Sequence, residues 1–279
     1  MKYRIPIIRN ASDFVYFLII SVLLPIVLLF DVIVVLPEIH EPDSFPYDFT
    51  IIMALLIYFN IHGNMIACMI IATSVKFETV REPSAADAER LEWRHCKTCD
   101  RFAPPRSWHC RYCGVCILKR DHHCGFMGCC IGHHNHRYFV CFVFYLFVGA
   151  IYALVYNTLY IVVFTDGVAN CWKNALVVRF PAHIPSCSFW VNVQIIIFGL
   201  NIFTLICASM ALIQQVSIVL RGAVSAECGR HPKYNCGIYH NLRSVFGVRM
   251  HLAWICPLIE SRLPSDGYSW KCISNKDLK

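Results

Sequence analysis

Four long apolar stretches dominate the pattern of hydrophobic and polar positions along this chain. A helix needs about 20 apolar residues to cross a hydrocarbon core of roughly 30 Å, and each stretch is at least that long. They lie near Phe14–Leu36, Phe49–Ser74, Tyr138–Phe164 and Phe189–Ile213. The pattern therefore predicts four membrane-spanning helices.

The first stretch differs from a signal peptide in its length and in the sequence at its end. A signal peptide has an apolar region of about 7–15 residues and then a small-residue cleavage site. Here the apolar run is longer and leads into the acidic sequence PEIHEPD at residues 37–43. We expect this segment to remain in the protein as a spanning helix.

Composition agrees with a membrane protein. Of the 279 residues, 57% are hydrophobic and 15% are charged, whereas soluble domains average about 45–50% and 25%. We expect an all-α polytopic membrane protein with a cysteine-rich domain between its second and third helices. The expected parts are a terminus with two helices, the cysteine-rich domain, two further helices with their loop, and a tail, at residues 1–74, 75–137, 138–220 and 221–279.

The distribution of lysine and arginine predicts the orientation, because short loops rich in these residues stay in the cytosol. Residues 1–13 carry three, residues 75–137 carry eleven and residues 221–279 carry nine. By contrast, the loop at 37–48 has none and the loop at 165–188 has two. Both termini and the cysteine-rich segment are therefore expected in the cytosol. Topology explains the +7 formal charge, so we expect membrane lipid and no nucleic acid as a partner.

Residues 95–132 hold eight of the seventeen cysteines of the chain. The cytosol keeps thiols reduced, so a cluster of cysteines there indicates metal binding or chemistry more than disulfides. The spacing is Cys96-x2-Cys99, then His109-Cys110-x2-Cys113-x2-Cys116, then Asp121-His122-His123-Cys124, then Cys130. Structural zinc takes four thiolate or imidazole ligands. The segment has enough ligands for two structural zinc ions, with some left over.

The leftover residues suggest chemistry at the sequence DHHC. In an extended segment successive side chains point in opposite directions, so His122 and Cys124 would share one side and His123 the other. One histidine could then hold zinc while its neighbour faces a thiol. Asp121 is close enough to orient His122, which would give a nucleophile, base and orienter. The alternative is that all of these residues bind or support zinc.

These residues resemble the DHHC palmitoyltransferase family, membrane enzymes that attach acyl groups to cysteines of other proteins. The pattern of the family's cysteine-rich domain is matched from Cys96 to Phe139, including PPR, HC, DHHC, CIG and Asn135. Four spans with this domain between the second and third are also the family's topology, and short β-hairpins are expected in the domain. The Arg221–Gly222 pair and the tail are most similar to the subgroup numbered twenty-four.

The resemblance implies a role for each residue of the cysteine-rich segment. One zinc ion would be held by Cys96, Cys99, His109 and Cys116, and the other by Cys110, Cys113, His123 and Cys130. Cys124 would be the nucleophile, His122 its base and Asp121 the orienting residue. The donor would be acyl-CoA (palmitoyl-CoA), and the acceptors would be cysteines of cytosol-facing proteins. The phosphates of the donor could meet nearby basic residues, with Arg106, Lys119, Arg120 and Arg137 as candidates.

Several positions depart from the family pattern. Ala103 stands where a basic residue is common, Phe126 where tryptophan is usual and Cys129 where asparagine is usual. The family's Thr-Thr-x-Glu motif, which braces the cytosolic domain, is reduced to VSAE at Val224–Glu227. Val224 has no side-chain hydrogen-bonding group, so weakened activity is expected if the first threonine is needed. A catalytically weak scaffold or adaptor is therefore the alternative function.

Other classes of protein fit the spacing less well. A membrane-bound ubiquitin ligase with a cross-braced zinc module needs a further CxxC pair after Cys116, and the sequence has none there. A zinc hydrolase needs an open coordination position, which saturated four-ligand sites do not provide. The resemblance implies a Golgi or endoplasmic reticulum membrane. Cys171 and Cys187 in the lumenal loop could form a disulfide there.

The predicted topology can be tested with epitope tags. Tags at residues 1, 85 and 279 should be accessible from the cytosolic side of sealed microsomes, and a tag near residue 42 should be protected, because the basic residues gather in the first three regions. Protection of the tag at residue 85 from added protease would contradict the predicted topology.

Overall fold

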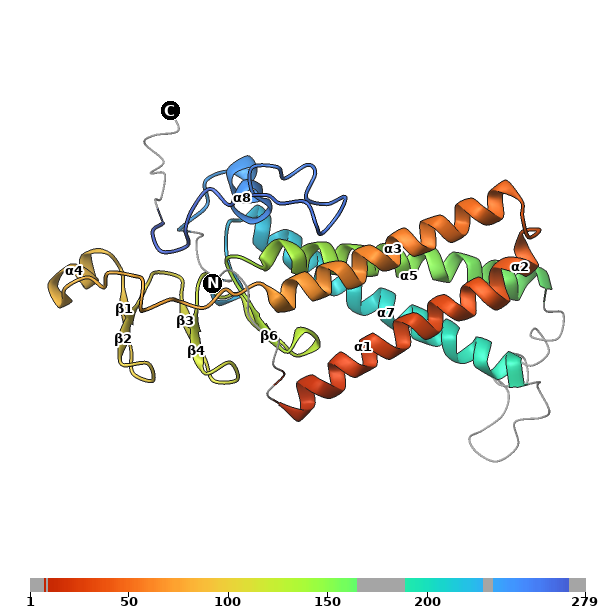
Figure 1. Ribbon diagram of the computed structural model, residues 1–279, viewed down its shortest axis with the longest axis horizontal. Coiled ribbons are helices and arrows are strands. Elements are labelled where there is room, and N and C mark those ends of the chain that lie inside the picture. Colours follow the sequence, from red (N-terminus) through yellow and green to blue (C-terminus); the bar gives the residue numbers. More distant parts are fainter. Residues whose placement is uncertain (1–7, 9, 165–188, 228–232, 271–279) are drawn as a thin grey trace. The chain divides into compact units, whose positions relative to one another are not determined.

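Helices make up most of the computed structural model, which describes residue 8 and residues 10–164, 189–227 and 233–270 (Figure 1). Four of its helices are long and apolar enough to cross a membrane, as the sequence predicts: Ala11–Ile39, Phe45–Ile70, His136–Val162 and Asn192–Leu220. The first is α1 (Ala11–Phe30) continued by a π-helical turn (Asp31–Val35) and α2 (Leu36–Ile39). The others are α3 (Phe45–Ile70), α5 (His136–Phe164) and α7 (Phe189–Leu220). Cys171 and Cys187 lie outside the described residues.

Two helices end at other residues than the apolar stretches that predict them. α3 ends at Ile70 rather than near Ser74, because the next residues run beside a strand: Val75 N–H donates to the Cys116 carbonyl at 2.8 Å and Leu118 N–H to the Thr73 carbonyl at 2.9 Å. α7 continues past Ile213 to Leu220. Its end coincides with the expected boundary of this part of the chain at residue 220, since a helix can continue beyond the apolar run that predicts it. This extension brings Gln215 to the cysteine-rich segment.

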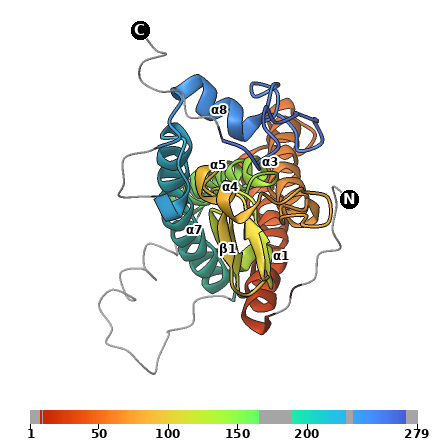
Figure 2. The same ribbon diagram turned by 90° about the vertical axis from the view of Figure 1, so that its left-hand side faces the viewer.

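The cysteine-rich segment folds into three two-stranded antiparallel hairpins, as the resemblance implies (Figure 1). The strands overlap in Figure 2, which is turned by 90° from that view. A short helix, α4 (Ala85–Arg90), precedes them, and Ser84 caps it by accepting from Asp87 N–H. The strands are β1 (Arg94–Cys96) with β2 (Arg101–Ala103), β3 (Trp108–Cys110) with β4 (Val115–Ile117), and β5 (His122–Cys124) with β6 (Cys129–Ile131). A 3₁₀ turn (Gly125–Met127) connects β5 to β6. Strands this short cannot hold their fold alone, so the hairpins need other cross-links.

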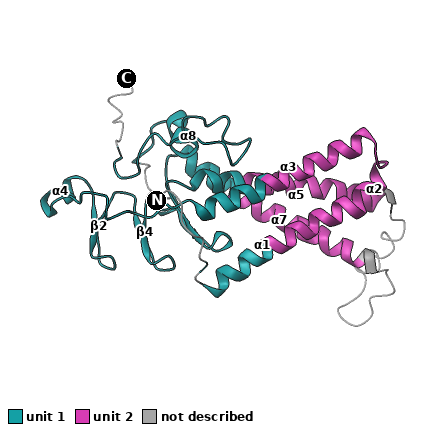
Figure 3. Ribbon diagram, in the orientation of Figure 1, with its two compact units in different colours: residues 1–20, 60–142, 212–279 teal, residues 21–59, 143–211 magenta. Residues whose placement is uncertain are grey.

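The chain forms two compact units (Figure 3). The first combines residues 1–20, 60–142 and 212–279, and the second combines residues 21–59 and 143–211. All six strands and the helix feet next to them in sequence therefore belong to the first unit. A 3₁₀ turn (Ser225–Glu227) and α8 (Ile238–Phe246) complete it.

An apolar cluster fixes the C-terminal tail within the first unit. Val140 and Cys141 of α5, Val219 of α7, and Val245 and Phe246 of α8 are buried together. The Phe246 ring stacks on Trp254 with the ring centres 4.4 Å apart. The tail therefore packs on the feet of α5 and α7.

A polar cluster crosses the helices of the second unit. Asn157 of α5 donates to Asp31 Oδ1 at 2.8 Å and accepts from Gln194 Nε2 of α7 at 2.9 Å. All three side chains are at most 5% exposed. Interhelical hydrogen bonds of this kind contribute to helix association in membranes.

Replacing Asn157 with leucine should destabilise the protein in detergent by about 1–3 kcal/mol, because Asp31 loses a donor and Gln194 an acceptor in a buried place. Thermal unfolding measures the change. Thr158→Val is the matched control, since Thr158 is exposed and its hydroxyl donates to the Leu154 carbonyl of the same helix. Equal stability of the two variants would contradict the prediction.

Candidate catalytic and metal-binding site

Eight cysteine and histidine side chains gather in two clusters. Cys96, Cys99, His109 and Cys116 form the first, and Cys110, Cys113, His123 and Cys130 form the second; within each, the donor atoms lie within 4.8 Å of one another. The first cluster joins the hairpins β1–β2 and β3–β4, and the second joins β3–β4 and β5–β6. Because β3–β4 supplies ligands to both clusters, the two clusters connect the three short hairpins one after another.

The spacing of the donor atoms fits zinc. In a tetrahedral site with Zn–S of about 2.3 Å and Zn–N of about 2.0–2.1 Å, neighbouring donors are roughly 3.4–3.8 Å apart. Cys99 Sγ lies 3.7 Å from Cys116 Sγ and 3.3 Å from His109 Nδ1. In the second cluster, His123 Nδ1 lies 3.6, 3.4 and 3.7 Å from the sulfurs of Cys110, Cys113 and Cys130. Three sulfurs and one imidazole in each cluster are a donor set typical of structural zinc.

An aspartate at the start of α1 contacts the histidine of the second cluster. The Oδ2 atom of Asp13 lies 3.0 Å from Nε2 of His123, the ring nitrogen that faces away from the sulfurs. Asn10 donates to the same oxygen at 3.0 Å. Histidine ligands of zinc commonly give their second N–H to a carboxylate, which fixes the ring and strengthens the ligand. Sequence reasoning missed Asp13, because no spacing connects it to a residue 110 positions later.

The β5–β6 hairpin separates this cluster from Cys124. His123 pairs with Cys130, both members of the second cluster, while Cys124 pairs with Cys129. Because side chains alternate along a strand, His122 and Cys124 lie on the opposite face from His123. Phe139 meets the His122 ring edge-on with the ring centres 4.9 Å apart. Cys129, a departure from the family pattern, thus lies directly across the hairpin from Cys124.

Asp121 is the most heavily bonded residue of the site. Its Oδ2 lies 2.8 Å from His122 Nδ1 and 3.1 Å from Gln215 Nε2. Its Oδ1 accepts from the backbone N–H of Ser225 at 2.7 Å and from the Ser225 hydroxyl at 2.8 Å. Since Asp121 accepts the Nδ1–H of His122, the free lone pair of that ring is on Nε2. This is the tautomer that a general base requires.

Burial and hydrogen bonding have opposite net effects on the pKa values of Asp121 and Cys124. Burial alone would raise the pKa of Asp121, but the hydrogen bond from His122, the neighbouring rings of His136 and His122, and the hydrogen bond from Gln215 lower it well below the usual range. Burial raises the pKa of the Cys124 thiol to about 11. Asp121 is therefore ionised at neutral pH, while Cys124 is protonated and needs a base to act as a nucleophile.

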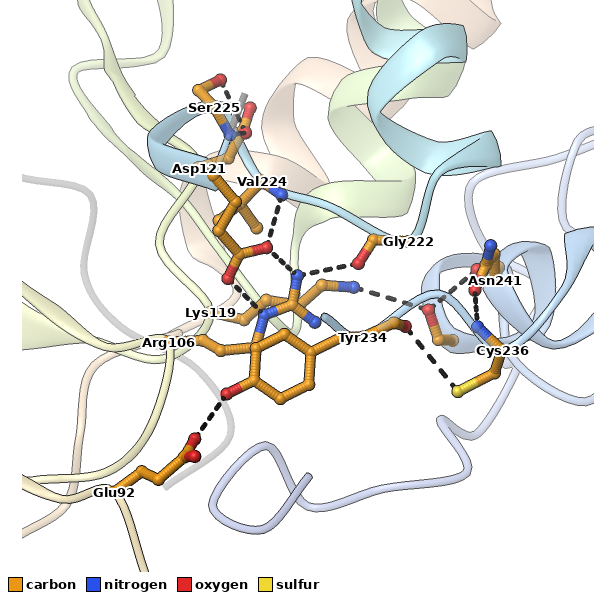
Figure 4. A network of polar contacts seen from close by, with 12 residues as sticks. Glu92, Arg106, Lys119, Asp121, Gly222, Val224, Ser225, Tyr234, Cys236 and Asn241 are labelled. Atoms are coloured by element: carbon orange, nitrogen blue, oxygen red, sulfur yellow. Dashed lines mark hydrogen bonds and ion pairs between the residues drawn. The ribbon is translucent and has the colours of Figure 1, made fainter. Parts of the chain in front are cut away.

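The sequence VSAE supports the site through backbone groups, through the Ser225 hydroxyl and through Glu227. Figure 4 shows Val224 and Ser225 in this network of polar contacts. Arg106 donates to both oxygens of Glu227, at 2.9 and 2.6 Å, and to the Gly222 carbonyl at 2.8 Å. Glu227 also accepts from the backbone N–H of Val224 at 3.2 Å. Position 224 thus contributes a backbone group, which valine supplies as well as threonine. Gly222 has φ +63°, and a Cβ there would lie 2.6 Å from Asn241 Oδ1, so glycine is required.

The four basic candidates for phosphate binding lie in different environments. Three are at most 5% exposed: Arg106, Lys119 and Arg137. Arg106 is held by Glu227, and Arg137 donates to the Ile259 carbonyl at 2.7 Å. Burial and neighbouring Arg106 lower the pKa of Lys119 to about 7. Only Arg120 is partly exposed, so it is the candidate that a phosphate in solution reaches most easily.

Comparison with known proteins agrees with this geometry. The family model described as DHHC palmitoyltransferase matches residues 89–229. A zebrafish (Danio rerio) protein named probable palmitoyltransferase ZDHHC24 is 34% identical over 67% of this chain and 64% of its own length. Palmitoyltransferase PFA4 of Mycosarcoma maydis is 38% identical over 66% of the chain and 39% of its own length. Probable protein S-acyltransferase 15 of Arabidopsis thaliana is 31% identical over 68% of the chain and 74% of its own length.

A hairpin domain with two zinc-type clusters and a separate cysteine next to an Asp–His pair has the residues of a DHHC cysteine-rich domain. The chain belongs to the DHHC palmitoyltransferase family. The similarity to proteins named ZDHHC24 agrees with the resemblance of the tail to the subgroup numbered twenty-four. The chain spans 64% of the length of the zebrafish relative and 39% of that of the Mycosarcoma relative.

Asp13→Ala should weaken metal binding at the second cluster by about 10- to 100-fold, because His123 loses the carboxylate that orients it. Asp13→Asn is the matched variant, since its amide oxygen can still accept from His123 Nε2 and should keep most of the affinity. Transfer of zinc to a coloured chelator measures both. Metal release from Asp13→Ala at the wild-type rate would show that the contact does not support the cluster.

Proposed function

We propose that this protein is a protein S-palmitoyltransferase. It transfers a long-chain acyl group from acyl-CoA to cysteines of cytosol-facing proteins, through an acyl-enzyme on Cys124. The observation that carries the proposal is the Asp121–His122 pair, with Oδ2 and Nδ1 2.8 Å apart, at the start of the strand that bears Cys124. His122 and Cys124 share a hairpin face that the second cluster does not use.

The first half-reaction forms the acyl-enzyme. Nε2 of His122 takes the proton of the Cys124 thiol, whose raised pKa makes this step necessary. The sulfur attacks the thioester carbonyl of acyl-CoA, the bond to the coenzyme sulfur breaks, and His122 returns the proton to the departing thiol. Asp121 stabilises the transient imidazolium and holds the ring in position.

The second half-reaction repeats this chemistry with a different thiol. His122 takes the proton of the acceptor cysteine, whose sulfur attacks the Cys124 thioester, and Cys124 leaves with that proton. A sixteen-carbon chain is strongly hydrophobic, at about 0.8 kcal/mol per buried methylene. A nucleophile next to spanning helices would allow the chain to stay in apolar surroundings while the coenzyme stays in water.

Eight residues would hold two zinc ions, in the two clusters described above. Bound there, zinc would have four protein ligands and would contribute folding free energy, with no open position for a substrate. The ions would fix three hairpins that are too short to be stable alone. Cys124 lies outside both ligand sets, so its thiol is available for acyl transfer.

The membrane arrangement follows the same proposal. Four spanning helices with both termini and the hairpin domain in the cytosol would present Cys124 to cytosolic acceptor proteins, in a Golgi or endoplasmic reticulum membrane. The charge distribution of the loops supports this orientation.

A weak scaffold or adaptor was the alternative, based on the reduced VSAE sequence. The contacts of that sequence favour the enzyme. Ser225 bonds to Asp121 twice, and Glu227 bonds to Arg106 twice. Val224 replaces a threonine at a position whose bond to Glu227 uses the backbone. The replacement of threonine by Val224 therefore leaves the hydrogen bonds from Ser225 to Asp121 in place.

Three variants test the separation of catalytic and metal-binding residues. Cys124→Ser should keep two zinc ions and lose labelling by radioactive palmitoyl-CoA. His122→Ala should also keep both ions and label slowly, because it removes the base. Cys110→Ser should lose zinc and unfold more easily, with activity lost as a consequence. Metal analysis, thermal unfolding and labelling of the purified proteins measure the three effects.

Hydroxylamine provides the control for the chemistry, because it cleaves thioesters. The label on the wild-type protein should be released by it. Loss of zinc from Cys124→Ser would refute the assignment of nucleophile and ligands together. A wild-type protein that takes up no label would favour the scaffold.

A further inference from the structure

Gln215 connects the fourth spanning helix to the proposed catalytic aspartate. It lies near the end of α7 with its side chain 3% exposed. Its Nε2 lies 3.1 Å from Asp121 Oδ2, and its Oε1 lies 2.8 Å from His136 Nε2 at the start of α5. The amide therefore bridges Asp121 and His136.

The direction of each hydrogen bond in this bridge is fixed by its neighbour. An ionised carboxylate only accepts hydrogen bonds, so Gln215 must turn its NH₂ group to Asp121. Its oxygen then faces His136, which must carry a proton on Nε2. His136 is 1% exposed, so water has little access to this ring. His136 thus prevents the amide from turning its oxygen towards Asp121, an orientation that would place two acceptors against each other.

We propose that Gln215, oriented by His136, is a positioning residue for acyl transfer. This inference rests on the proposed function and adds a residue to its machinery. Gln215 donates to Oδ2, the same oxygen that receives the His122 Nδ1–H, while Ser225 holds Oδ1. With both oxygens held, the carboxylate plane cannot rotate, and the direction in which it holds the His122 ring is fixed.

Loss of this restraint should affect the rate more than donor binding. Gln215 contacts neither of the proposed reacting atoms; it acts through Asp121 on the ring of the base. General-base catalysis depends strongly on this geometry. Donor affinity depends on groups that meet the acyl chain and the coenzyme, so it should change little.

The chain offers a matched control for the experiment. Gln214 is the preceding residue of the same helix, with the same side chain, and it is exposed. Methionine has nearly the shape of glutamine, favours helix and cannot make this bridge. We therefore compare Gln215→Met with Gln214→Met in the full-length protein, measuring the rate of autoacylation over a range of palmitoyl-CoA concentrations.

Gln215→Met should lower the maximal rate by about 10- to 100-fold, as expected for loss of a hydrogen bond to a charged group. Its KM for palmitoyl-CoA should stay within about twofold of wild type, and two zinc ions should remain. Gln214→Met should have the maximal rate, KM and zinc content of the wild-type protein. The maximal rate of Gln215→Glu should fall at least as far, because the new carboxylate can accept from His136 but cannot donate to Asp121.

A double variant tests the role of His136. If His136 acts by orienting Gln215, adding His136→Phe to Gln215→Met should cause no further loss of rate, although His136→Phe alone lowers it. Additive losses would show that His136 does not act through Gln215. Wild-type rates in Gln215→Met, with labelling still dependent on Cys124, would overturn the inference and leave the proposed function standing. Labelling that survives Cys124→Ser would instead refute the proposed function.

Discussion

A single buried carboxylate organises the site. Asp121 is 4% exposed, and a buried charge is tolerated only when its hydrogen-bonding capacity is filled. Its partners come from three places in the chain: His122 beside it, Gln215 on α7 and Ser225 in the turn after that helix. The need to satisfy this one group therefore sets where α7 ends relative to the β5–β6 hairpin. The hairpin, the helix end and the turn form one assembly around it.

The second determinant is the series of hairpins that presents Asp121. Each hairpin has only three paired positions, so neither hydrogen bonding nor apolar burial is sufficient to fix it. The two clusters supply the missing cross-links, and each joins one hairpin to the next. Arg106 adds a third connection, from the loop between β2 and β3 to Gly222 and Glu227. The contacts of Arg106 and the two clusters thus both restrain the hairpins.

Much of this was predictable from the sequence, and the remainder has a physical reason. Apolar length predicts the four helices, and the local spacing of cysteines and histidines predicts metal sites. The alternation of His122, His123 and Cys124 follows from strand geometry once the segment is extended. Spacing alone could not divide the eight ligands between two clusters, since interleaved and consecutive pairings satisfy it equally; the family resemblance was needed. Contacts such as Asp121 with Gln215, 94 residues away, have no local pattern. A pair of glutamines at the end of an apolar run was the only signal.

The contact between Asp13 and His123 has a consequence for biosynthesis. The two residues are separated by 110 positions, and the chain emerges from the ribosome at about 5–20 residues per second. The first spanning helix is thus complete many seconds before its partner histidine has been made. During that interval Asp13 has no cluster to support, and it remains a solvated charge at the end of a newly inserted helix. Closure of the second cluster is therefore a late event in maturation, reached only after the nascent chain has delivered two spanning helices and three hairpins.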